Sequence, residues 1–292
     1  MDTNKNTYTV IYTIVLVAVV ATILAVVSIG LKPKQQENIK VEKQMNILGC
    51  DNLAAEAKTA SNKNAYIQDE FKKYITEALV VNTSGEVLES FDSDIDNCNA
   101  FKVSPADQFD LMRKIDGTQD QAAKDAMVKD LRLPVFICSN PDGTKHYILS
   151  GYGAGLWGPL WSYIAVKEDG KIAGALFDHA SETPGLGGEI VTDKFRSQFT
   201  GKVILSDGEI IPVTVVKGGN ANAEANEINA ISGATITSKA VQTMISNWMN
   251  YYKPYLQKVA SGAAHSEAPV EVENPNEETI AEQNSEQTIK TE

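Results

Sequence analysis

The chain has 292 residues, enough for one or two domains, and its 38 acidic against 26 basic residues give a formal net charge of −12. An acidic chain without a basic cluster argues against nucleic-acid binding. Its three cysteines and three histidines are scattered, without a CxxC motif or metal-ligand spacing. We therefore predict no metal site and no catalytic triad. We interpret Cys50, Cys98 and Cys138 as buried, unreactive thiols, with one disulfide as the alternative.

An uncharged apolar run extends from Tyr8 to Leu31. Because roughly 20 helical residues cross the hydrocarbon core of a bilayer, this run predicts one transmembrane helix in contact with membrane lipid. A cleaved signal peptide is the alternative. Its apolar region is usually roughly 7–15 residues long and ends in a small-x-small site. This run is longer and ends in Ile29-Gly30-Leu31-Lys32, so we expect an uncleaved anchor.

The lysines around this run leave its orientation open. Lys32, Lys34, Lys40 and Lys43 follow the run, whereas only Lys5 and the amino terminus precede it. The positive-inside rule alone would place the following domain in the cytoplasm, but a large following domain weakens that rule. The span itself contains no charged residue, so we do not expect it to form an ion path.

Beyond the anchor, residues 32–45 form a polar stalk, and the next hundred residues mix helical and strand patterns. Asn64–Leu79 has a helical period, with one apolar face made of Ile67, Phe71, Tyr74, Ile75 and Leu79. Residues 77–90 predict two strands around a Ser-Gly turn. Residues 125–152 predict a short helix and then two strands around an Asn-Pro-Asp-Gly turn.

The second half predicts two more hairpins and a long final helix. The hairpins turn at Asp169-Gly170 and Asp207-Gly208, and residues 192–201 predict a short amphipathic helix between them. The final helix is expected from about Ile236 to Leu256, with regular helix ending near Pro254; its apolar face comprises Val241, Ile245, Trp248 and Tyr252. The fold class is therefore α+β, with a mainly antiparallel sheet and flanking helices.

The last 32 residues form an acidic tail. Residues 261–292 contain eight glutamates, one lysine and no aromatic residue. Such a segment cannot bury enough apolar surface to offset its ordering entropy, so we expect it to be disordered.

Three segments are too unusual in composition for ordinary turns. GYGAGLWGPLW (151–161) combines four glycines with two tryptophans, and HASETPGLGGEI (179–190) contains three glycines. AISGATITSKAV (230–241) places four hydroxyl side chains before the final helix. Glycine permits close backbone approach, tryptophan offers a flat face, and a helix N-terminus favours a phosphate. Together they suit a flat aromatic ligand with a phosphate.

The same segments have plainer interpretations. The glycines could form tight turns, Trp157 and Trp161 could be core residues, Glu182 could be a solvated loop acid, and the hydroxyl cluster could be a redundant helix cap. No strand–GxGxxG–helix unit is present, so this is not a dinucleotide-binding fingerprint.

Several motifs together carry a specific resemblance. With its single anchor, GLWGPLWSYIAV, ETPGLGGEI, QFTGK and SGATITS, the chain resembles, over nearly its whole length, the NqrC family of subunits of the bacterial sodium-translocating NADH:quinone oxidoreductase. In that family, FMN is joined by a phosphodiester bond to the threonine of SGAT, which here is Thr235. A flavin transferase makes that bond outside the cytoplasm. The family pattern usually begins with Asp, where this chain has Asn229.

The resemblance implies a set of cofactor-binding residues. Thr235 would hold FMN covalently, and the residues around its phosphate would be Ser232, Gly233, Ala234, Thr237 and Ser238. Gly155, Leu156 and Trp157 would line the flavin, and Glu182, Thr183, Leu186 and Gly187 would lie opposite. Lys217 is a further candidate for the phosphate, on charge alone.

The resemblance also implies a function and a location. The chain would be an electron-relay subunit that works with the other subunits of the reductase, in a bacterial inner membrane with its large domain outside the cytoplasm. The expected organisation is a cytoplasmic end (1–7), a transmembrane helix (8–31), a stalk (32–45), the N-terminal part of the extracytoplasmic domain (46–145), an FMN-binding domain (146–258) and the tail (259–292). The alternatives are the homologous flavin subunit of the Rnf complex and a membrane-tethered scaffold without flavin.

Overall fold

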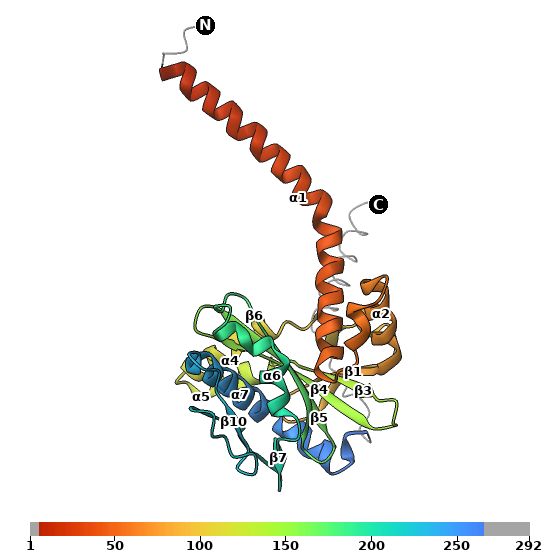
Figure 1. Ribbon diagram of the computed structural model, residues 1–292. Helices are drawn as coiled ribbons and strands as arrows, with labels where there is room; N and C mark the ends of the chain where they lie inside the picture. The colour runs from red at the N-terminus through yellow and green to blue at the C-terminus, as the bar shows by residue number, and fades with distance from the viewer. Residues whose placement is uncertain (1–5, 266–292) are drawn as a thin grey trace, which may run out of the picture.

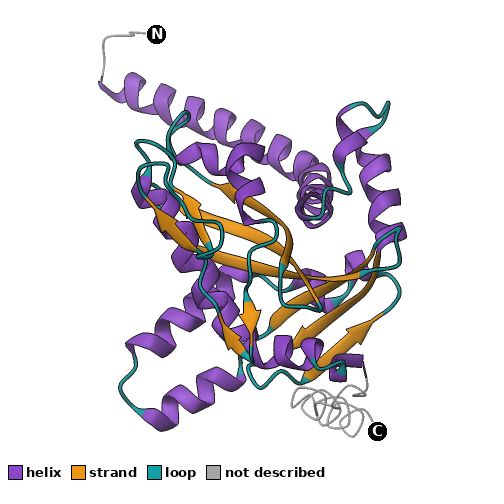
Figure 2. Cartoon of the chain, turned by 60° about the horizontal axis from the view of Figure 1, so that its bottom comes forward, coloured by secondary structure: helices purple, strands orange, loops and turns teal. Residues whose placement is uncertain are grey.

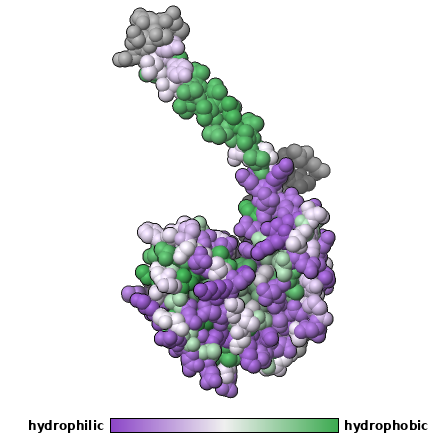
Figure 3. Space-filling view, in the orientation of Figure 1, coloured by the Kyte–Doolittle hydropathy of each residue, from purple (hydrophilic) through white to green (hydrophobic). Residues whose placement is uncertain are grey.

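The computed structural model describes residues 6–265, and residues 1–5 and 266–292 lie outside the described part. A single helix, α1 (Asn6–Cys50), projects from a mixed domain (Figure 1). Its apolar residues up to Leu31 are exposed and form a continuous hydrophobic band in Figure 3. Within the described residues, α1 is the one helix long and apolar enough to cross a membrane.

The stalk is part of the same helix. α1 continues through Pro33 and ends only at Cys50, with Ile47 and Leu48 fully buried in the domain. A proline inside a helix removes one backbone hydrogen bond and commonly bends the axis. α1 bends along its length (Figure 1). The anchor therefore enters the core directly as helix.

A six-stranded antiparallel sheet, in the order β2-β1-β3-β4-β5-β6, forms the centre of the domain (Figure 2). Its strands are β1 (Ile75–Val81), β2 (Val87–Phe91), β3 (Leu133–Ser139), β4 (Lys145–Ala154), β5 (Pro159–Lys167) and β6 (Ile172–His179). Successive strand residues face opposite sides. Accordingly, Val135 and Ile137 join one core cluster, whereas Phe136 and Cys138 join the other. The predicted α+β class with an antiparallel sheet is confirmed.

Helices cover both faces of this sheet. On one face lie α4 (Pro105–Gly117), α5 (Gln121–Lys129) and α7 (Thr235–Ala260). On the other lie the end of α1, α2 (Lys63–Tyr74) and α3 (Asn99–Lys102). The remaining short elements are η1 (Ala55–Lys58), η2 (Ile95–Asn97), η3 (Gly187–Val191), α6 (Asp193–Arg196), η4 (Ser197–Phe199), β7 (Leu205–Ser206), β8 (Glu209–Ile210), β9 (Thr214–Val216), β10 (Glu227–Asn229) and η5 (Ala263–His265).

The helix expected over Asn64–Leu79 is too long. It ends at Tyr74, and Ile75 and Leu79 lie in β1, where they face different core clusters. The run from Ile75 to Val81 is rich in β-branched residues, which favour a strand. β1 is also paired on both sides, with β2 and β3, so tertiary pairing outweighs the helical period.

The final helix is longer than expected. α7 passes through Pro254 and ends at Ala260, and Val259, 4% exposed, packs in the core. Burial of Tyr255, Leu256 and Val259 beyond the proline offsets the hydrogen bond that it removes. The boundary of the tail at 259 is therefore wrong, because 259–265 belong to α7 and η5. The rest of the tail lies outside the described residues.

The other hairpins follow the sequence closely, with one exception. The turns at Asp169-Gly170 and between β3 and β4 join long paired strands as expected. The turn at Asp207-Gly208 is present, with positive φ at both residues, but joins strands of only two residues each. The chain then leaves this hairpin, and β9 pairs in parallel with β10.

Candidate functional site

Glu182 joins three segments at one end of the sheet. Its side chain is buried, with 4% of the residue exposed. Oε1 accepts hydrogen bonds from the backbone N–H groups of Leu156 (2.7 Å) and Trp157 (3.0 Å), and Oε2 accepts one from Thr237 Oγ1 (2.8 Å). The carboxylate therefore connects the β4–β5 turn, the loop after β6 and the first turn of α7.

The first segment is a tight hairpin turn. Ala154 pairs with Pro159, and the Gly155 N–H donates to the Gly158 carbonyl at 2.8 Å. The turn leaves Leu156 46% and Trp157 67% exposed. The plainer interpretation of Trp157 as a core residue is therefore wrong, because its indole lies on the surface.

Two glycines leave room for the Glu182 carboxylate. A Cβ at Gly155 would lie 2.5 Å from Glu182 Oε1, and one at Gly187 would overlap Glu182 Oε2 and approach Thr237 Oγ1 to 2.7 Å. Real Cβ atoms are not found so close to another heavy atom. The glycines at these two positions are thus explained by the buried acid alone.

The loop after β6 is held by its own backbone and by His179. The Thr183 carbonyl accepts from the N–H groups of Leu186 (3.1 Å) and Gly188 (2.9 Å). His179 Nδ1 accepts from the Glu182 N–H at 3.2 Å. His179 was not among the site residues expected from the sequence. Its place at the head of the glycine-rich segment was the available signal.

The start of α7 lacks a side-chain cap. Ala234 occupies the N-cap position and contributes no capping hydrogen bond. The first intrahelical bond runs from Ser238 N to Ala234 O at 3.0 Å. Within the described residues, the N–H groups of Thr235, Ile236 and Thr237 therefore have no hydrogen-bond partner. Free N–H groups and the helix dipole make such a terminus favourable for an anion.

The four hydroxyls of this region have different surroundings. Thr237 donates to Glu182, while Ser238 donates to the Ala234 carbonyl (2.9 Å) and accepts from the Ile231 N–H (3.0 Å). Ser232 is exposed and Thr235 is half-buried, and neither side chain has a hydrogen bond within the described residues. Direct contact of Thr237 or Ser238 with a phosphate stays a prediction and would require exchange of these bonds.

Gly233 and Ala234 shape the approach to the helix. Gly233 has a φ of +77°, which favours glycine, and a Cβ there would lie 2.9 Å from a methyl carbon of Leu186. This contact brings the loop after β6 against the segment before Thr235. Ala234 is buried beneath it.

Asn229 and Lys217, both singled out in the sequence, lie near this segment. Asn229 Oδ1 accepts from the Ala221 N–H at 3.0 Å, a contact that an Asp carboxylate could also make. Lys217 is exposed and follows Val216, whose carbonyl accepts from the Ala230 N–H at 2.8 Å. The Lys217 side chain has no hydrogen bond within the described residues, so its role stays a prediction.

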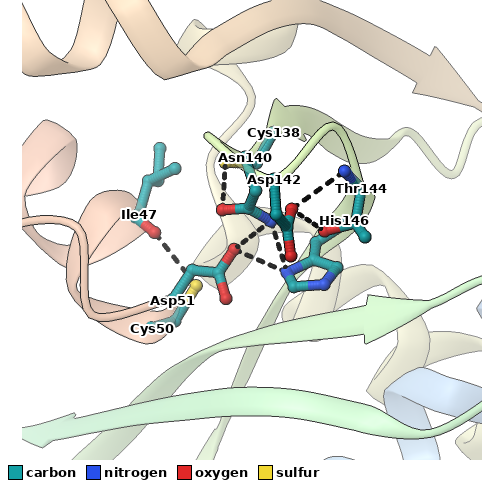
Figure 4. Close-up of polar contacts among 8 residues, drawn as sticks. All are labelled: Ile47, Cys50, Asp51, Cys138, Asn140, Asp142, Thr144 and His146. Carbon is teal, nitrogen blue, oxygen red and sulfur yellow. Dashed lines mark hydrogen bonds and ion pairs between the residues drawn. The ribbon is translucent and has the colours of Figure 1, made fainter.

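A second polar cluster lies at the opposite end of β4 (Figure 4). His146 Nδ1 lies 2.6 Å from Asp51 Oδ2, and Asn140 Nδ2 lies 2.8 Å from His146 Nδ1 and 3.2 Å from Asp51 Oδ2. These contacts connect the end of α1 to the β3–β4 hairpin. The residues are largely buried, which suits a structural tie between the anchor and the sheet.

The three cysteines are buried and free, as expected. Burial raises the pKa of the Cys138 thiol to about 12 and that of Cys50 well above its usual value. Thiols with raised pKa values carry little thiolate and react slowly. Among the described residues, no group of histidines, cysteines and acids could hold a metal ion.

Comparison with known proteins places this geometry in a family. Residues 155–250, which include all three joined segments, match the family model of the FMN-binding domain. The chain is 30% identical to NqrC of the Na(+)-translocating NADH-quinone reductase of Vibrio alginolyticus over 264 residues, covering 89% of this chain and 97% of that protein. The chain belongs to the NqrC family. NqrC of Yersinia pestis is also 30% identical, over 260 residues.

Solved structures of the NqrC family share the fold. The structure of the Parabacteroides distasonis protein is 33% identical, with a TM-score of 0.59, and the match covers 77% of this chain and 96% of that one. NqrC from Shewanella oneidensis is 23% identical, with a TM-score of 0.56 over 76% of this chain and 98% of that one. At that identity the second match supports the fold alone.

Proposed function

We propose that this chain carries FMN joined through its phosphate to Thr235 and relays electrons within a Na(+)-translocating NADH:quinone oxidoreductase. The observation that carries the proposal is the uncapped start of α7 at Thr235, inside the region that matches the FMN-binding domain. Membership of the NqrC family supports the quinone reductase over the Rnf complex and over a scaffold without flavin.

The residues at this site fit a bound phosphate. Thr235 is the first residue of α7, and the N–H groups of Thr235, Ile236 and Thr237 have no other partner within the described residues. To form the linkage, the Thr235 hydroxyl loses its proton and its oxygen makes the new phosphorus–oxygen bond. The flavin donor loses the group that its phosphate carried. The free N–H groups would stabilise the phosphate's remaining negative charge.

The surroundings also fit a flat apolar ring. Leu156, Trp157, Leu186 and Ile236 are 46%, 67%, 42% and 63% exposed. Exposed apolar side chains that gather in one place mark a binding surface. Trp157 offers a face for stacking, and Glu182 holds its turn in place from below.

The protein's part in a relay would be positional and electrostatic, since bound FMN supplies the redox chemistry. Glu182, Gly155 and Gly187 fix the hairpin and the helix start relative to each other. Covalent attachment would keep the cofactor on an exposed surface. We also propose that α1 crosses the membrane with its N-terminus in the cytoplasm and the domain outside it, where a flavin transferase acts.

The test is intact-mass spectrometry of variants expressed with the flavin transferase. Thr235→Val keeps the β-branched shape but removes the only oxygen that can form the ester, so the mass of FMN should be lost. Thr237→Val, two residues later on the same helix, is the matched control and should keep FMN. Loss of FMN from Thr237→Val and retention in Thr235→Val would contradict the assignment.

A further inference from the structure

A groove of about 790 Å³ lies where α1 enters the domain, away from the carboxylate that joins the candidate site. The α1 segment 36–46 forms one wall, and the chain from Phe101 to Ala106 forms a second. The third wall is formed by the ends of β4 and β5, with Tyr152 and Trp161. Ligand sites commonly have volumes of roughly 300–1,000 Å³ and aromatic linings, so the groove has the dimensions of a binding site.

Ile39 is an apolar side chain on the wall of this groove with nothing covering it. It is 65% exposed, and the other exposed large apolar residues of α1 all lie between Val10 and Leu31, in the run expected to contact lipid. Ile39 lies beyond that run, among polar residues. Its exposure is explained if another molecule covers it.

Lys43, on the same wall, is a cation without a carboxylate partner. Its Nζ donates to the carbonyl oxygens of Phe101 and Val103 and lies 4.7 Å from the centroid of the Phe101 ring. No carboxylate of the described residues lies within ion-pair distance, whereas the neighbouring Lys40 pairs with Asp96 at 2.8 Å. Burial lowers the pKa of Lys43 to about 8. An incoming carboxylate would provide the missing counter-charge.

Asn46 adds an unused amide at the inner end of the groove. The residue is 8% exposed, lines the groove, and its side chain forms no hydrogen bond within the described residues. A carboxamide both donates and accepts, so it complements a peptide group, which has one N–H and one C=O. An acyl chain could satisfy neither.

The height of the groove above the membrane argues against a lipid. At 1.5 Å per residue, Lys43 lies about 18 Å and Asn46 about 22 Å along α1 from Leu31. The headgroup layer is only about 5–8 Å thick on each side, and a helix tilt of about 40° lowers these heights by about a quarter. Lys43 and Asn46 therefore lie beyond the reach of membrane lipid.

We propose that this groove receives an extramembranous peptide segment of another subunit of the same complex. The segment places an apolar side chain against Ile39 and Trp161, a carboxylate at Lys43 and a peptide group at Asn46. This inference rests on the proposed function in so far as it requires a multisubunit complex. It assigns the surface by which the membrane-proximal part of the domain is fixed to its neighbour.

The experiment compares two adjacent exposed residues in the full chain, expressed in membranes with the other reductase subunits. Ile39→Arg introduces a charge into the groove, and Asn38→Arg introduces the same side chain beside it, outside the groove. We expect about tenfold less of the Ile39→Arg chain in the purified complex, and parental amounts of Asn38→Arg. Both should keep FMN by intact mass. Retention of Ile39→Arg within about twofold of Asn38→Arg would overturn the proposal.

Photo-crosslinking identifies the occupant directly. With p-benzoylphenylalanine at position 39, we expect a crosslink to another reductase subunit, and with the same residue at position 38 we expect a much weaker one. A crosslink at position 39 only to lipid, to a second copy of this chain or to its own residues 266–292 would overturn the proposal. A parental chain without FMN that does not copurify with the reductase subunits would contradict the proposed function instead.

Discussion

Replacing Glu182 by Ala should destabilise the domain measurably, even without cofactor. The substitution removes three hydrogen bonds to a carboxylate, from Leu156 N, Trp157 N and Thr237 Oγ1. A hydrogen bond to a charged group contributes about 1.5–3 kcal/mol. Water can replace part of this at the exposed turn, so we expect a loss of about 2–4 kcal/mol. At about 2–4 °C per kcal/mol for a domain of this size, the melting temperature should fall by about 4–16 °C.

Glu182→Gln separates charge from shape. The Gln oxygen can still accept from both turn N–H groups, and its NH2 can donate to Thr237 Oγ1, so we expect a loss of about 1 kcal/mol. Thermal unfolding of the apo-protein, made without the flavin transferase, measures both variants against the parent. If Glu182→Ala melts within about 1 °C of the parent, the carboxylate does not hold the three segments together.

Three other predictions concern the rest of the chain. Lys43 should make stability rise with pH: the unfolded chain holds this proton more tightly (ordinary pKa 10.5 against about 8 when folded), so the parent should gain about 2 kcal/mol between pH 7 and 9.5 relative to Lys43→Met in urea unfolding, and equal slopes would refute this. Gly174→Ala should cost more than about 3 kcal/mol, because its Cβ would overlap the Cys50 carbonyl at the end of α1, whereas Gly117→Ala, with open space around it, should be neutral or stabilising; urea unfolding compares them, and equal midpoints would contradict the packing. Protease added to intact spheroplasts should digest the domain, and full protection would contradict the proposed orientation.

Local chemistry predicted much of this fold from the sequence. The Asp169-Gly170 turn and the alternation along β5 and β6 defined that hairpin, because turn residues and burial agree there. The helix expected through Leu79 failed because pairing with two strands outweighed a helical period. The end of α7 failed for a similar reason: burial of Val259 is a tertiary effect that a proline rule cannot include.

The candidate site shows a comparable division. The three unusual segments could be selected by composition, but not their connection through Glu182, which was one acid among 38 acidic residues. Sequence spacing cannot show that a carboxylate is buried or that two glycines make room for it. The Asp51–His146 contact spans 95 positions, so no local pattern could indicate it.

The unbroken course of α1 from its apolar end into the core limits how the domain can move. A flexible linker would let the domain sample a hemisphere above the bilayer. A helix that ends among Ile47 and Leu48 inside the domain instead transmits its own tilt and rotation to the sheet. If α1 spans the membrane, Thr235 stays within a narrow range of heights, and its encounter partner has to stand in that same layer.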